Sequence, residues 1–71
     1  MYELDKVARN QILTQKIEAY KNQLYSAKLD VKVAEIVEDE RAKEAATAVV
    51  KKILQALEYL LEEQKTLLEE E

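Results

Sequence analysis

Apolar residues in the first half of the chain recur at alternating spacings of four and three. They are Leu13, Ile17, Tyr20, Leu24, Ala27, Val31 and Ala34. This spacing is typical of the heptad seam of an α-helix that packs along a partner helix. The pattern predicts a first helix over about residues 3–37, with a single narrow apolar seam.

The seam stops soon after Ala34, because the next positions in the same frame are mostly polar. Apolar residues return in a different phase, two residues out of step with the heptad, which a continuous coiled coil does not easily absorb. This shift predicts a turn at about residues 38–39 and a second helix over about residues 40–70, with Asp39 as its N-cap. Two rows of the second helix keep the four-three spacing: Val50, Leu54, Leu57, Leu61, Gln64 and Leu68, and Ala42, Ala46, Val49, Ile53, Ala56 and Leu60.

Two arms of nearly equal length predict an antiparallel two-helix hairpin. In such a hairpin the numbers of facing residues add up to about 77, so Ile17 faces Leu60 and Leu13 faces Gln64. Two alternatives stay open, because neither glycine nor proline marks the turn. One is a continuous rod, and the other is a chain of three helices with a further break near Leu29-Asp30.

The apolar surface is too wide for one helix pair. On a helical wheel the second helix gathers thirteen apolar residues within about half of its circumference. The first helix carries a second stripe roughly opposite its seam, a candidate second interface made of Tyr25, Leu29, Val33 and Ile36. We therefore expect the hairpin to dimerise into a four-helix bundle. The residues assigned to core and self-association are Leu13, Ile17, Tyr20, Leu24, Val31, Val50, Ile53, Leu54, Leu57, Leu60, Leu61 and Leu68.

One polar residue interrupts the second seam. Gln64 falls among leucines and level with Asn10, so the two form a candidate polar layer that fixes register and oligomer order. The alternative interpretation is that both are boundary residues near a fraying end of the hairpin.

Composition fits one all-α domain spanning residues 1–71. The chain is 48% hydrophobic and 37% charged, which is typical of amphipathic helices. It has no apolar run near the length of a membrane span and no signal peptide, so we expect a cytoplasmic protein that does not insert into membranes.

The residue types needed for most catalytic and metal sites are missing. There is no histidine, cysteine or glycine, and Ser26 is the one serine and has no recognisable base. We therefore expect no enzymatic activity and no cofactor or metal.

A nucleic-acid interface is the remaining chemical candidate. Lys21, Lys28 and Lys32 share one side of the first helix, with Tyr25 near them. The expected architecture is similar to that of ROP-type hairpin dimers, which bind RNA on a helix face, but this likeness is architectural only. The net charge of −4 argues against nucleic acid as the partner.

The sequence therefore favours a non-catalytic interaction protein, a self-associating hairpin that acts as scaffold, adaptor or regulator. Its main partner is a second copy of itself, as a homodimer or a higher homo-oligomer. The first alternative is an escort that binds a helix of a client protein on the same apolar faces. The second is an RNA-binding hairpin dimer.

Overall fold

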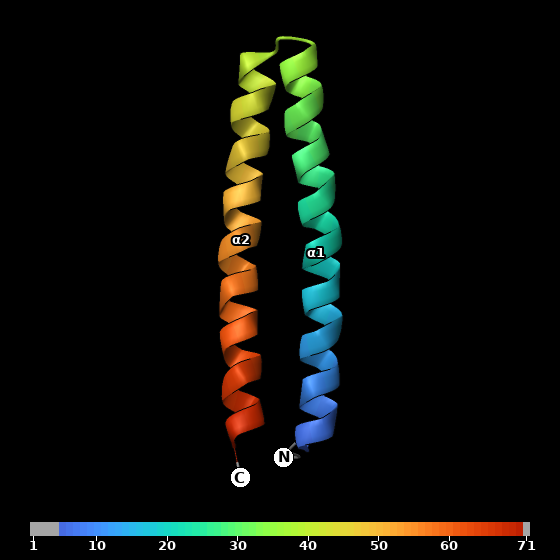
Figure 1. The fold of residues 1–71 in the computed structure, drawn as a ribbon, viewed down its shortest axis with the longest axis vertical. Coiled ribbons are helices and arrows are strands. Elements are labelled where there is room, and N and C mark those ends of the chain that lie inside the picture. Colours follow the sequence, from blue (N-terminus) through green and yellow to red (C-terminus); the bar gives the residue numbers. More distant parts are fainter. Residues whose placement is uncertain (1–4, 71) are drawn as a thin grey trace, which may run out of the picture.

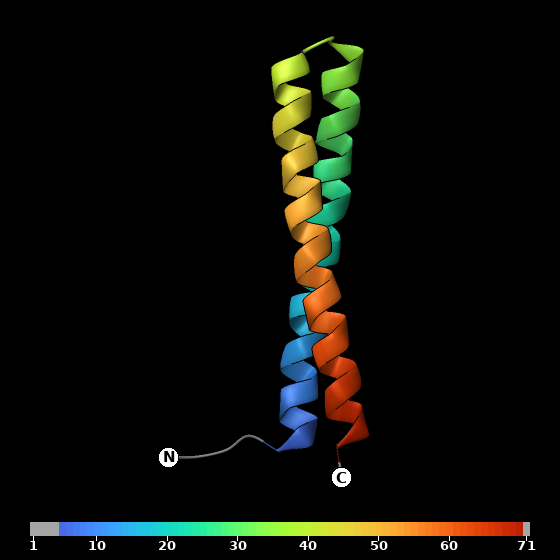
Figure 2. The ribbon, with the colours of Figure 1, turned by 90° about the vertical axis from the view of Figure 1, so that its left-hand side faces the viewer.

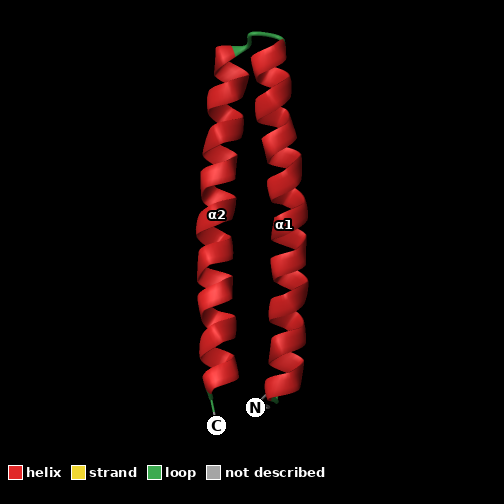
Figure 3. Cartoon of the chain, in the orientation of Figure 1, coloured by secondary structure: helices red, strands yellow, loops and turns green. Residues whose placement is uncertain are grey.

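The computed structural model describes residues 5–70 as two α-helices joined by a short turn. Helix α1 spans Lys6–Ile36 and helix α2 spans Glu40–Glu69. They run antiparallel and side by side (Figures 1 and 3) in a shape of 52 × 20 × 15 Å. The predicted all-α hairpin is confirmed, and the alternatives of a continuous rod and of three helices are wrong.

Each helix begins at an aspartate that caps it. The Asp5 carboxylate accepts a hydrogen bond of 2.7 Å from the Ala8 N–H, and the Asp39 carboxylate accepts one of 3.0 Å from the Ala42 N–H. These bonds satisfy N–H groups that have no partner within the first turn of a helix. Asp39 is thus the N-cap that the sequence predicted. Helix α1 begins at Lys6 rather than near residue 3 because of the Asp5 cap, and residues 3 and 4 lie outside the described residues.

The turn is made without glycine. Glu38 has a φ of 58°, in the left-handed region that glycine usually occupies. The Asp39 N–H donates to the Ala34 carbonyl at 2.9 Å, and the Glu38 N–H donates to the Glu35 carbonyl at 3.2 Å. This pair of bonds is a Schellman motif, which closes the end of α1. Because Asp39 also caps α2, the chain reverses within three residues, 37–39.

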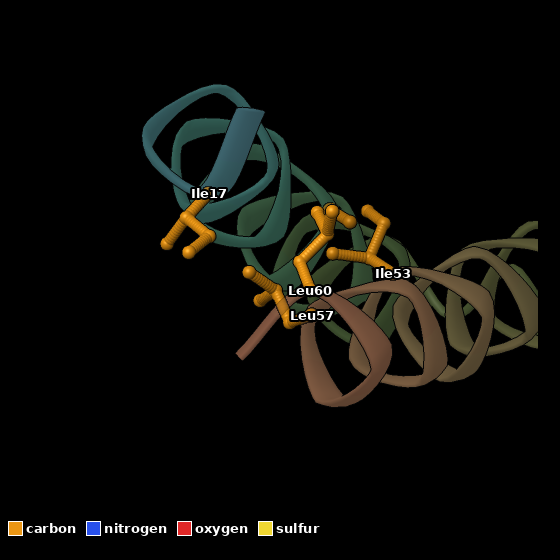
Figure 4. Packing of buried hydrophobic residues seen from close by; sticks show 5 residues of the cluster. Ile17, Ile53, Leu57 and Leu60 are labelled. Carbon is orange, nitrogen blue, oxygen red and sulfur yellow. The ribbon is translucent and has the colours of Figure 1, made fainter. Parts of the chain in front are cut away.

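The core lies along the line where the two helices meet. Ile17, Ile53, Leu57 and Leu60 are buried there and point toward one another across the hairpin (Figure 4). In a view at right angles to Figure 1 the two helices cross each other (Figure 2), as helices joined by a heptad seam do. The seam of α1 is the predicted one, since all seven of its residues are buried or partly buried.

The seam of α2 agrees with the predicted pairing of Leu60 with Ile17 and of Gln64 with Leu13, but it follows neither of the two four-three rows alone. The residues of α2 that face α1 are Lys43, Ala46, Val50, Ile53, Leu57, Leu60, Gln64 and Leu67. From Ala46 to Gln64 they alternate between the two rows, because each row taken alone follows one edge of the broad apolar face, and Lys43 and Leu67 belong to neither row. The helix instead presents the middle of that face to its single partner.

Contacts across the hairpin agree with the predicted register. Gln64 bonds to Thr14, Lys43 lies 3.3 Å from Glu35, and their residue numbers add up to 78 in both cases. The Lys43 stem occupies a seam position near the turn, while its ammonium group reaches the Glu35 carboxylate at the edge.

Replacing Glu38 by glycine should stabilise the hairpin. A side chain at a positive φ is unfavourable, so Glu38→Gly should raise the free energy of unfolding by about 0.5–1 kcal/mol. Lys52→Gly, at an exposed position inside α2, is the matched control and should lower it by about 1 kcal/mol. Urea denaturation followed by circular dichroism measures both. Destabilisation by both variants would mean that residue 38 does not adopt the left-handed conformation.

The core prediction concerns Leu57, which is 7% exposed. Leu57→Ala should lower the free energy of unfolding by about 2–5 kcal/mol, because it leaves a cavity between the helices. Ile36→Ala removes an aliphatic side chain that is 80% exposed and should change stability by no more than about 0.5 kcal/mol. Equal effects of the two substitutions in thermal or urea denaturation would show that the wrong face of α2 has been placed inside.

Candidate interaction surfaces

Most residues assigned to the core from sequence do lie between the helices. Four of them are buried and a further five are partly buried: Ile17, Ile53, Leu57 and Leu60, then Leu13, Tyr20, Leu24, Val31 and Val50. Leu67, at 4% exposure, is a core residue that the assignment left out. Its signal was present in the sequence, since it follows Gln64 at the seam spacing of three.

Three leucines assigned to the core lie outside it. Leu54, Leu61 and Leu68 are 48%, 50% and 59% exposed, so their placement in the core of the hairpin was wrong. Each directly follows a buried seam residue, and the step of about 100° per residue turns it onto the flank of α2. Their seven-residue spacing aligns them along that flank, and we call them the leucine row. Their predicted role in self-association stays a prediction.

The predicted second interface is open to solvent over its full length. The exposed fractions of Tyr25, Leu29, Val33 and Ile36 are 67%, 47%, 57% and 80%. Val33 also lines a groove that α1 shares with α2. The hairpin therefore leaves this stripe uncovered.

A shallow groove, which the sequence pattern did not predict, follows the helices near the turn. Its lining is mostly small and apolar: Asp30, Val33, Ala34, Val37, Asp39, Ala42, Ala45, Ala46 and Val49. Val49 and Leu54 stand about 140° apart around α2 at 100° per residue, so the groove and the leucine row lie on opposite flanks. The cluster of alanines was visible in the sequence, but which flank it lined depended on the observed seam.

Near the open end, polar groups join the helices. The Gln64 amide donates to the Asn10 side-chain oxygen at 3.0 Å and to the Thr14 hydroxyl at 3.2 Å. Gln64 and Asn10 are both partly buried, so the structure brings together the two residues of the candidate polar layer. A few residues further on, Arg9 pairs with the Glu70 carboxylate at 3.3 Å. These contacts all connect the first turns of α1 to the last turns of α2.

The Gln64–Asn10 bond can be tested with a double-mutant cycle. Gln64→Ala and Asn10→Ala should show a coupling energy of about 0.5–1.5 kcal/mol, the net worth of a partly buried hydrogen bond. Gln64→Ala combined with Gln23→Ala is the control. Gln23 lies about two helical turns further along α1 than Thr14, so the effects of these two substitutions on the free energy of unfolding should add to within about 0.5 kcal/mol. Additivity of the Asn10 and Gln64 effects in urea denaturation would contradict an energetic role for this layer.

The described residues 5–70 hold no group of three or more acidic side chains placed to bind a metal ion. Within the same part of the chain, neither helix has the length and apolar character needed to cross a membrane. Lys21, Lys28 and Lys32 are exposed on α1, and Lys32 lies 3.9 Å from Glu35. No protein-family model matches the sequence, and it has no match among curated proteins or solved structures.

Proposed function

We propose that this chain is a non-catalytic protein–protein interaction module that self-associates as a helical hairpin. A homodimer in the form of a four-helix bundle is the simplest assembly, and it would serve as scaffold, adaptor or regulator. The observation that carries the proposal is the surface area that the single hairpin leaves exposed.

The hairpin exposes 5940 Å², whereas the usual scaling for a monomeric protein of 8.2 kDa gives about 4,500 Å². The difference is roughly 1,400 Å² per chain, or about 2,800 Å² for a pair of chains. Obligate homodimers bury about 2,000–5,000 Å² in total. One interface between two copies would therefore bring the exposed area to the level expected of a folded protein.

The kind of surface that is exposed supports the same proposal. Among the described residues, twelve large hydrophobic side chains are exposed, whereas the core consists of seven buried hydrophobic residues, two of them alanines. Most of these side chains belong to the leucine row, to the stripe on α1 or to the groove near the turn. Large apolar side chains that gather on an exposed surface mark sites of protein association.

Mass in solution tests the proposal directly. Sedimentation equilibrium should give about twice the chain mass of 8.2 kDa at micromolar concentration. Because folding is then coupled to association, a thirty-fold rise in concentration should raise the melting temperature by roughly 5 °C. A monomer with a melting temperature independent of concentration would contradict self-association and leave the escort function as the better explanation of the same surfaces.

A further inference from the structure

The leucine row is bordered by charges of alternating sign. Glu44, Lys51, Glu58 and Lys65 recur every seven residues along α2, about 60° around the helix from the leucines on the side away from the core. We call them the charge row. All four are exposed, and none forms an ion pair with another of the described residues.

The charge row is complementary to itself in one direction. When a second copy of α2 is laid antiparallel, Lys51 stands opposite Glu58 of that copy, and Glu44 stands opposite Lys65. Both pairs are centred on the same point of α2, between Leu54 and Gln55. A single two-fold axis at that point therefore forms four ion pairs between the two copies.

The apolar residues fit the same axis. Leu54 meets Leu54 of the second copy, Leu61 lies opposite Thr47, and Leu68 lies opposite Glu40 at the start of the second copy's α2. Because the axis passes close to the middle of the hairpin, the two copies overlap over nearly their full length. Near the axis the contact thus sets Leu54 against Leu54 and Leu61 against the smaller Thr47, as a close-packed interface requires.

Other arrangements of the same flank bring like charges together. A parallel pair of α2 helices in register places Lys51 beside Lys51 and Glu58 beside Glu58. In a bundle with both turns at the same end, α2 packs against α1 of the second copy. Residues whose numbers add up to about 78 then stand opposite each other, as they do within one hairpin. Lys28 and Lys32 share this flank with Thr47, so that bundle brings Lys51 close to Lys28 but Glu44 close to Lys32, and its charges are only partly complementary. Like charges that face each other across an interface are unfavourable.

We infer that the self-association surface is the flank of α2 formed by the leucine row and the charge row. Two copies bind there with their α2 helices antiparallel and their turns at opposite ends of the dimer. The inference rests on the proposed self-association and adds to it the surface, the orientation and the register.

Charge reversal tests orientation and register together. Lys51→Glu and Glu58→Lys each turn two attractive pairs of the dimer into repulsive ones and should raise the dimer Kd by about tenfold. The double variant with both changes restores opposite charges across the axis, so its Kd should return to within about twofold of the parent. An equimolar mixture of the two single variants should form a heterodimer of parental affinity.

Sedimentation equilibrium gives the Kd values, and circular dichroism verifies that each variant remains helical. If the parent dimerises but the single reversals leave Kd unchanged, or the double variant is weaker than either, the inferred surface and orientation are wrong while self-association stands. If the parent itself is monomeric, the proposed function fails first, and the two failures are thus distinguishable.

A matched pair of exposed positions tests the surface independently. Leu54 and Val49 are 48% and 47% exposed on opposite flanks of α2. Leu54→Lys should raise the dimer Kd at least a hundredfold by placing a charge on the two-fold axis, whereas Val49→Lys should change it less than threefold. The reverse result would assign the interface to the groove near the turn and overturn the inference.

Discussion

Two helices that pack along a single line can shield only a narrow strip of each other's surface. This constraint determines most of what the hairpin looks like. The strip is filled by a seam of apolar residues from each helix, and Ile17, Leu57 and Leu60 form its centre. Everything apolar that lies beyond the strip stays exposed, including the leucine row. The elongated shape and the large exposed area are both consequences of having one helix–helix contact and no third layer.

Polar residues within the strip are accommodated by local partners. Gln64 interrupts the leucines of α2, but its amide bonds to Asn10 and Thr14 on α1. Lys43 occupies a seam position near the turn, where its ammonium group is close enough to the edge to pair with Glu35. A buried polar group without a partner would cost about 1–3 kcal/mol. Among the described residues, no buried side-chain nitrogen or oxygen lacks a hydrogen-bond partner.

The features predicted correctly from sequence are those decided by local spacing or local chemistry. The seam of α1 is narrow, so only one face of that helix fits a partner, and the aspartate before α2 is a strong capping residue. The residues of α2 that face α1, such as Leu60 opposite Ile17, followed from pairing α2 with the α1 seam. Spacing along α2 alone did not select them, because its apolar face is wide enough to contain several rows with the same spacing. Which row turns inward depends on where α1 lies, and this is a tertiary property. The left-handed Glu38 had no signal at all, since glutamate rarely adopts that conformation.

The candidate surfaces also divide into those that local spacing decides and those that the packing of the two helices decides. The stripe that begins at Tyr25 could be recognised because it lies opposite a well-defined seam. The leucine row was recognised as apolar but was placed in the core, and its exposure followed only from the observed seam. The groove near the turn combines residues from both helices, so its lining could be read only once the register and the rotation of each helix were known.

Both ends of the described chain lie at the same pole of the hairpin, opposite the turn (Figure 1). They are close enough for the Lys6 ammonium group to donate a hydrogen bond of 2.6 Å to the Glu70 carbonyl. A short linker between the two ends would therefore keep both helices in place if the chain were opened at Glu38 instead. Such a circular permutant has the same seam and the same register but the opposite helix order. The closeness of the two ends thus makes the packing of this hairpin compatible with either order of its helices along the chain.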